Sequence, residues 1–171
     1  MDNQIDKKEF IKLIQENKGI IFKICNSYCH NKEKREDLAQ EIVYQLWRSS
    51  HSFHADLKFS TWMYRVALNV AISYYRKSKR SDAVVSLSDN LKDIEDDDDD
   101  DIEDEYEKNR RLLQRFINEL KELDRTLIIL FLESKSYMEI AEILGMTETN
   151  VATKIYRIKD QLKQKTINFI H

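Results

Sequence analysis

Residues 136–164, SYMEIAEILGMTETNVATKIYRIKDQLKQ, decide the fold of the C-terminal part of the chain. A short apolar helix face is expected before the glycine, formed by Ile140, Ala141 and Leu144. Gly145 predicts the end of that helix, because glycine adopts a left-handed turn at little cost. Thr147 then stands where it would cap a second, longer helix. A short helix, a glycine turn and a capped longer helix indicate a helix-turn-helix.

The second of these helices carries different chemistry on its two faces. Its expected buried stripe consists of Val151, Ile155, Ile158 and Leu162. The opposite face carries Thr149, Asn150, Thr153, Lys154 and Arg157. Asn150 suits adenine, and Lys154 or Arg157 suits guanine or a phosphate, if this face enters the major groove of DNA. A plain two-helix hairpin would have the same apolar stripe, so the polar face is what favours DNA binding.

The composition of the whole chain favours an all-α fold. Its 171 residues include no proline and only two glycines, the residues on which tight hairpin turns depend, and 35% are charged. No apolar run approaches the ~18 residues that a membrane span needs. We therefore expect a cytoplasmic protein with no membrane insertion.

Net charge is distributed very unevenly along the chain. Residues 82–107 carry fourteen acidic residues and one lysine, a net charge of −13, whereas residues 1–81 carry +6 and residues 108–171 carry +4. The overall charge of −3 hides this pattern. Like charges repel one another and keep a segment extended, so the middle segment is expected to be a flexible linker between two basic blocks.

Apolar spacing predicts a bundle of three or four helices in the first block. A helix over residues 36–49 is expected to bury Leu38, Ile42, Val43, Leu46 and Trp47. The next helix, over residues 60–80, is expected to start with Ser60 as its N-cap. Its expected buried stripe consists of Trp62, Val66, Val70 and Tyr74.

Two segments of this block narrow the function. REDLAQEIVYQLWRS at 35–49 and FSTWMYRVALNVAISYYRKSKR at 59–80, followed by the helix-turn-helix, closely resemble the extracytoplasmic-function (ECF) sigma factors of bacterial RNA polymerase. The resemblance extends from about Phe10 to Lys163. It implies two small helical domains joined by the acidic linker: residues 1–81 for core polymerase binding and −10 recognition, the linker at 82–107, and residues 108–171 for −35 recognition.

The same resemblance assigns site residues. Core polymerase binding falls on Asp37, Leu38, Gln40, Glu41 and Tyr44. Recognition and melting of the −10 element fall on Arg65, Asn69, Ser73, Arg76, Lys77 and Arg80. Recognition of the −35 element falls on Thr149, Asn150, Thr153, Lys154 and Arg157. Three positions depart from the family pattern: Ser73 stands for the usual aspartate, Lys154 for a common arginine and Thr149 for a frequent glycine.

The predicted function is therefore to direct the polymerase core enzyme to specific promoters and to assist promoter opening, with no enzymatic activity and no cofactor. By resemblance, an anti-sigma factor is an expected further partner. For the acidic linker three roles stay open: a solvated tether, a mimic of RNA in basic channels of the polymerase, or a segment that folds back on the basic blocks and weakens stray DNA binding. One alternative function is a stand-alone helix-turn-helix transcriptional regulator, which would bind duplex DNA without polymerase. Another is a helical adaptor or anti-factor that binds proteins only, and the charges of +6 and +4 count against it.

Two cysteines raise the question of a metal site. Cys25 and Cys29 lie four residues apart, with His30 beside them, and this spacing puts both thiols on one helix face. A closed zinc site needs about four ligands, and the sequence offers no second pair. We therefore predict no metal site and two buried, reduced cysteines.

Overall fold

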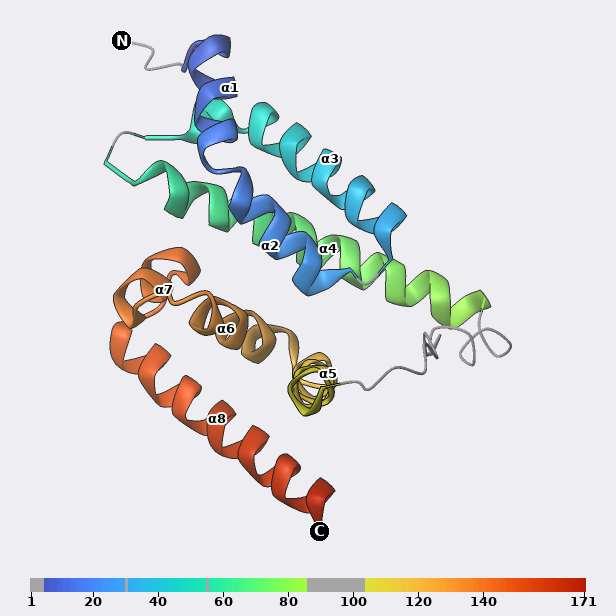
Figure 1. Cartoon of the computed structure of the whole chain (residues 1–171). Helices are drawn as coiled ribbons and strands as arrows, with labels where there is room; N and C mark the ends of the chain where they lie inside the picture. Colours follow the sequence, from blue (N-terminus) through green and yellow to red (C-terminus); the bar gives the residue numbers. More distant parts are fainter. Residues whose placement is uncertain (1–4, 30, 55, 86–103) are drawn as a thin grey trace. The chain divides into compact units, whose positions relative to one another are not determined.

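A computed structural model describes residues 5–29, 31–54, 56–85 and 104–171, with the backbone alone described at 81–85 (Figure 1). Its helices are α1 (Lys7–Glu16), α2 (Lys18–Tyr28), α3 (Lys32–Arg48), α4 (Phe59–Val85), α5 (Glu105–Asn118), α6 (Glu122–Leu132), α7 (Tyr137–Leu144) and α8 (Glu148–Ile170), with a short 3-10 turn at Ser50–Ser52. These described residues contain no strand, so the all-α prediction is confirmed.

The chain divides into two compact units, one built mainly from residues 1–83 and the other mainly from residues 84–171. We call them the N-terminal and C-terminal units. The acidic run at 94–103 lies outside the described residues apart from its flank at Asp104, so the linker boundaries and the predicted mimicry of RNA stay predictions.

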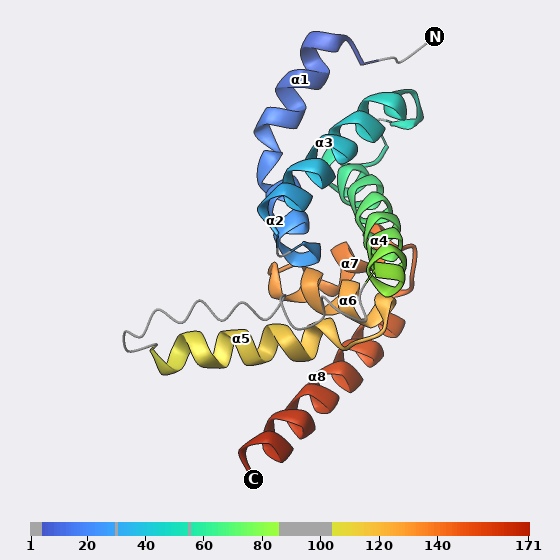
Figure 2. The ribbon, with the colours of Figure 1, turned by 90° about the vertical axis from the view of Figure 1, so that its right-hand side faces the viewer.

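The N-terminal unit packs α2, α3 and α4 around an apolar core, with α3 lying alongside α4 (Figures 1 and 2). The largest fully buried side chains here are Ile24, Leu38, Ile42, Leu46 and Met63. Helix α3 starts four residues earlier than predicted, because the Asn31 side chain accepts hydrogen bonds from the backbone N–H groups of Glu33 (2.8 Å) and Lys34 (3.3 Å). The first turn of α3 is thus held by an asparagine cap rather than by the core.

Two predictions about α4 are wrong. The helix starts at Phe59, so Ser60 lies inside it and is not its N-cap. The rings of Phe53, Phe59 and Trp62 contact one another with centroids 5.4–5.5 Å apart, and these contacts fix the start of the helix. The buried face also differs from the predicted one and consists of Trp62, Met63, Tyr64, Ala67, Leu68 and Ala71. Val66, Val70 and Tyr74 are only half-buried. The side of α4 that carries the small alanines packs more closely against the neighbouring helices, so that side is the buried one.

The C-terminal unit contains the predicted helix-turn-helix, formed by α7 and α8. Ser136 and Glu139 form a reciprocal capping box at the start of α7, with hydrogen bonds of 3.1 and 2.8 Å. Gly145 has φ +66°, and the Thr147 hydroxyl accepts from the Asn150 N–H at 3.2 Å. The buried stripe of α8 consists of Val151, Ile155, Ile158 and Leu162. The glycine turn, the threonine cap and this stripe are all confirmed.

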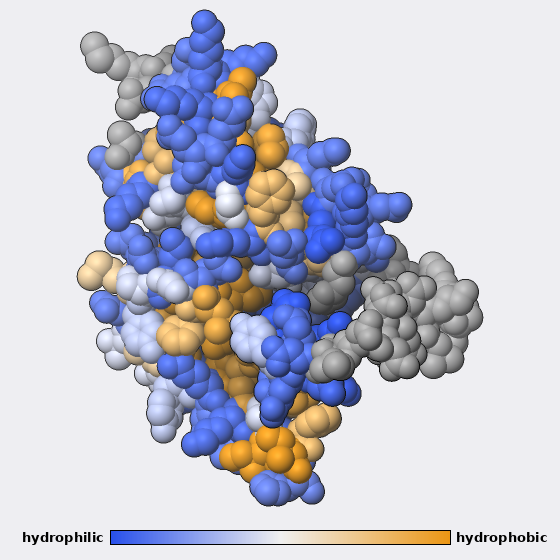
Figure 3. Space-filling view, viewed as in Figure 1, coloured by the Kyte–Doolittle hydropathy of each residue, from blue (hydrophilic) through white to orange (hydrophobic). Residues whose placement is uncertain are grey.

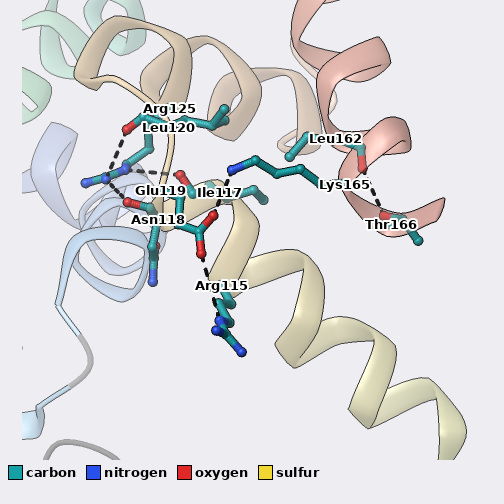
Figure 4. Close-up of polar contacts among 9 residues, drawn as sticks. All are labelled: Arg115, Ile117, Asn118, Glu119, Leu120, Arg125, Leu162, Lys165 and Thr166. Carbon is teal, nitrogen blue, oxygen red and sulfur yellow. Dashed lines mark hydrogen bonds and ion pairs between the residues drawn. The ribbon is translucent and has the colours of Figure 1, made fainter. Parts of the chain in front are cut away.

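A buried arginine holds the turn between α5 and α6 (Figure 4). Arg125 is 4% exposed, and its guanidinium donates hydrogen bonds to the backbone carbonyls of Ile117, Asn118 and Leu120. Ile117 and Asn118 are the last residues of α5, and Leu120 lies in the turn that follows. Carbonyls at a helix end lack most of their helical N–H partners, and the helix dipole favours a positive charge there. Arg125 therefore acts as a buried C-terminal cap supplied by the following helix.

The end of α8 is joined to α5 by a second contact, also drawn in Figure 4. The Lys165 Nζ lies 2.7 Å from a carboxylate oxygen of Glu119, and the hydrogen bond and charge of Lys165 lower the pKa of Glu119. The Phe169 ring meets the Phe116 ring edge-on at 6.2 Å. Apolar side chains nonetheless remain exposed at the end of α8, namely Ile167, Phe169 and Ile170. An orange patch lies there in Figure 3, just above the blue atoms at the foot.

Candidate functional site

The polar face of α8 lies where the sequence placed it. Thr149, Asn150, Thr153 and Arg157 are exposed on the side of α8 away from its buried stripe, and Lys154 is half-buried at the edge of that stripe. The helix begins at Glu148, so these side chains occupy its first three turns, the part that enters a major groove in helix-turn-helix proteins. Their contact with DNA stays a prediction.

One exposed aromatic residue on α8 was missed by the sequence reasoning. Tyr156 is 73% exposed, the most exposed large apolar or aromatic side chain described. At about 100° per residue it lies on the same side of α8 as Thr149 and Thr153. Tyr156 follows Thr149 by seven residues and Thr153 by three, and this spacing could have indicated that it shares their exposed face. An aromatic residue in a helix, however, more often belongs to the core.

The residues predicted for the −10 element share one face of α4. All six are exposed: Arg65, Asn69, Ser73, Arg76, Lys77 and Arg80. Their spacing keeps them within an arc of about 120° around the helix axis. Four of the six carry positive charge, so this face suits a nucleic-acid backbone, with Asn69 and Ser73 as its polar neutral members.

The five residues predicted to contact the polymerase do not form one surface. Leu38 is fully buried in the core of the N-terminal unit. Gln40 and Tyr44 line a groove between α3 and α1. Asp37 and Glu41 line a different groove, between α3 and α4. Helix α3 therefore presents two exposed sides of contrasting chemistry.

The groove between α1 and α3, which we call the apolar groove, has a volume of about 580 Å³. Its lining consists of Lys7, Phe10, Ile11, Ala39, Gln40, Val43, Tyr44 and Trp47. The prediction that Val43 and Trp47 belong to the core is wrong, since both are substantially exposed here. The Phe10 ring of α1 meets the Trp47 ring edge-on, with ring centroids 5.1 Å apart, and this contact leaves Trp47 44% exposed.

The groove between α3 and α4, which we call the polar groove, has a volume of about 660 Å³. Its lining consists of Asp37, Glu41, Gln45, Asn69, Val70, Ser73, Tyr74 and Lys77. Gln45 donates to Glu41 at 2.9 Å, and Lys34 donates to Ser78 across the two helices at 3.4 Å. The acidic side of α3 and part of the predicted −10 face of α4 thus border the same space.

Both cysteines are free and buried at the end of α2, which confirms that part of the prediction, while His30 lies outside the described residues. The pKa of Cys25 is raised from 9.0 to about 12. The main cause is burial, and the electrostatic interaction with the nearby Cys29 is the second. Burial also raises the pKa of Cys29. In the part of the chain that the structure describes, no cluster of three or more histidine, cysteine or acidic side chains is placed to hold a metal ion.

We predict that Cys25 reacts slowly with iodoacetamide in the folded chain at neutral pH. A pKa of about 12 leaves far less thiolate than in an unfolded chain, and thiolate is the reactive form. The neutral thiol favours folding below pH 9, and this contribution is lost as pH rises toward 12. Mass spectrometry of labelling with and without urea measures the difference. Equal labelling rates at Cys25 in the two conditions would contradict the prediction.

No described helix combines the length and the apolar character needed to cross a membrane.

Comparison with known proteins finds a matching family model for each unit. The family model described as Sigma-70 region 2 matches residues 13–81, and the model described as Sigma-70, region 4 matches residues 110–162. The ECF RNA polymerase sigma factor SigW of Bacillus subtilis is 30% identical over 173 residues, covering 94% of this chain and 90% of that protein. The RNA polymerase sigma-H factor of Pseudomonas aeruginosa is 28% identical over 168 residues, covering 92% and 86%.

Two solved structures share the fold. CnrH in complex with the cytosolic domain of CnrY has a TM-score of 0.67 at 16% identity, covering 95% of this chain and 90% of that one. The sigma factor RpoE in complex with the anti-sigma factor NepR, from Bartonella quintana, has a TM-score of 0.57 at 20% identity, covering 92% and 94%. Both likenesses extend over nearly the whole of each chain.

Proposed function

Since this chain belongs to the sigma-70 family and is an ECF RNA polymerase sigma factor, we propose that each of its exposed surfaces has a separate role in transcription initiation. As a sigma factor it binds the polymerase core and directs it to promoter DNA. Sigma factors are non-catalytic initiation factors, and we propose that this chain likewise performs no covalent chemistry. We also propose that it works in the cytoplasm, where promoters and core polymerase meet.

The core enzyme is proposed to dock on α3. The observation that carries this assignment is the apolar groove, in which Tyr44 and Trp47 remain exposed although both are large aromatic side chains. Aromatic residues of this kind are enriched in the energetically dominant centres of protein interfaces. Gln40 lines the same groove and can hydrogen-bond to a partner. Leu38 is buried and anchors α3 in the core of the N-terminal unit. Asp37 and Glu41 provide acidic contacts from the polar groove on the other side of α3.

The DNA contacts are proposed for the other two surfaces. The basic arc on α4 is proposed to hold the non-template strand at the −10 element, where Asn69 and Ser73 border the polar groove and can contact bases. The first three turns of α8 are proposed to enter the major groove at the −35 element. Tyr156 is added to this surface because of its exposure. The two family matches fall on either side of the acidic segment, which supports the boundaries 1–81, 82–107 and 108–171.

An anti-sigma factor is proposed as a regulatory partner. One structure of the same fold holds the sigma factor RpoE together with its anti-sigma factor NepR. The apolar groove on this chain gives such an inhibitor a surface that core polymerase would also need. Competition for that groove would then keep the sigma factor inactive.

The test uses sigma-free core polymerase, the purified chain and linear DNA of promoter regions. We expect the chain to bind the core, to produce promoter-specific transcripts, and to make bases near −10 reactive to permanganate. Core alone and chain alone are the controls. A chain that binds duplex DNA tightly by itself but does not bind core polymerase would overturn this function in favour of a stand-alone regulator.

A further inference from the structure

The exposed face of α8 includes an apolar part that lies among its polar residues. The Thr153 hydroxyl donates a hydrogen bond to the Thr149 backbone carbonyl at 3.0 Å. This internal bond uses the hydroxyl proton, so the methyl group is the part of Thr153 best placed to meet a partner. Thr153 is exposed to solvent.

Tyr156 extends this apolar part. It follows Thr153 by three residues, so the two side chains are neighbours on the helix surface. The tyrosine ring is 73% exposed and makes no hydrogen bond, ion pair or ring contact within the described residues. An aromatic side chain that adds nothing to the core and faces outward beside a threonine methyl group is suited to apolar contact with a ligand.

Charged groups limit where this contact falls. Lys154 and Arg157 lie to one side of the pair, where they suit phosphates or guanine. Asp160 follows Tyr156 by four residues on the same face and is exposed. Its carboxylate repels the phosphate backbone, so base contact is expected to end at Tyr156. The methyl group and the ring therefore stand within the base-contacting part of the helix.

We propose that Thr153 and Tyr156 determine specificity by contacting the 5-methyl group of a thymine in the −35 element. Thymine is the only base whose major-groove edge presents a methyl group, and threonine methyl groups and aromatic rings are its usual protein partners. The proposal rests on the function of α8 given above and adds a base and the pair of residues that select it. The other polar residues of the face contact the neighbouring base pairs.

The experiment uses the holoenzyme reconstituted from core polymerase and the full chain. Preferred −35 sequences are first selected from a pool of duplexes, and each selected thymine is then replaced in turn by deoxyuridine, which lacks only the methyl group. At one position we expect binding to weaken about fourfold, the effect of one buried methyl group. Replacing other thymines should leave binding unchanged.

Two threonine variants separate the methyl group from the hydroxyl. Thr153→Val keeps a methyl group at this place and removes the hydroxyl, and it should retain the preference for thymine over deoxyuridine. Thr153→Ser keeps the hydroxyl and removes the methyl group, and it should lose that preference, as should Tyr156→Ala. Circular dichroism provides the folding control, since both residues are exposed.

The outcomes distinguish this inference from the function on which it rests. A holoenzyme with no −35 preference overturns both. A clear −35 preference with thymine and deoxyuridine equivalent at every position overturns the inference alone. Retention of the preference by Thr153→Ser together with its loss in Thr153→Val would show that the hydroxyl is the contacting group, and would equally overturn it.

Discussion

Replacing Arg125 with methionine is expected to unfold the C-terminal unit under conditions in which the N-terminal unit stays folded. Arg125 is almost completely buried and donates to three backbone carbonyls, two in the last residues of α5 and one in the turn after it. Methionine occupies similar space but donates no hydrogen bond. The Ile117 carbonyl keeps the Leu120 backbone N–H as a partner at 3.1 Å. Each buried acceptor left without a partner costs about 1–3 kcal/mol, so a loss of about 2 kcal/mol or more is expected. Arg125→Lys should lose less stability, because the lysine ammonium can still donate hydrogen bonds to some of these carbonyls, although it lacks the planar donors of the guanidinium.

The chain supplies its own reporters for this experiment. Both tryptophans, Trp47 and Trp62, lie in the N-terminal unit, so their fluorescence in urea reports that unit alone. Circular dichroism at 222 nm reports the helices of both units. We expect Arg125→Met to produce an early transition in circular dichroism while the fluorescence transition stays in place. Loss of −35 binding should accompany the early transition.

The matched control is Arg115→Met, the same substitution on α5. Arg115 has a side chain 69% exposed, and it forms a surface ion pair with Glu119 at 3.8 Å. Such pairs contribute about 0–1 kcal/mol, so this variant should unfold almost as the unmodified chain does. If Arg125→Met behaved like Arg115→Met, the buried cap would not contribute to stability as proposed.

The contrast between these two arginines shows what the sequence could and could not predict. Gly145 and Thr147 act on their immediate neighbours, so their roles follow from local sequence and are confirmed by φ +66° and a 3.2 Å cap bond. Arg125 bonds to carbonyls five to eight residues earlier, across a turn. Its function depends on how α5 and α6 meet, which spacing alone does not specify.

Helix α4 shows the same limit for packing. Its apolar residues are numerous enough to support more than one buried face. Spacing alone gives no reason to prefer Met63, Ala67 and Ala71 to Val66 and Val70. The neighbouring helices decide the matter, because alanines allow close approach. The polar residues of α4 could still be placed, since basic side chains remain exposed whichever apolar face packs inward.

For the predicted polymerase contact, spacing indicated which side chains are exposed but not how the neighbouring helices divide them. Spacing correctly indicated that Asp37, Gln40, Glu41 and Tyr44 are exposed. It could not indicate that α1 lies along one side of α3 and α4 along the other, because that arrangement is tertiary. The resulting separation into an apolar and a polar groove makes the contribution of each side testable.

Tyr44→Ala is expected to weaken binding to core polymerase by about 30-fold or more, the effect of removing an aromatic side chain from the centre of an interface. Tyr44 is 55% exposed, so the substitution should leave the stability of the free chain nearly unchanged. The dissociation constant is measured by titrating core polymerase into the fluorescently labelled chain. Glu41→Gln, on the polar groove, should have a smaller effect because it removes one rim charge without removing packed surface.

Phe22→Ala is the matched control, because Phe22 is an aromatic residue of the same unit, 59% exposed on α2, and lines neither groove. It should bind core polymerase as the unmodified chain does. Equal losses in Tyr44→Ala and Phe22→Ala would indicate a nonspecific effect of lost apolar surface. An unchanged affinity in Tyr44→Ala with a large loss in Glu41→Gln would move the contact to the polar groove. In that case α3 would dock through its acidic side, and the core enzyme would compete with DNA for the space beside Asn69 and Lys77.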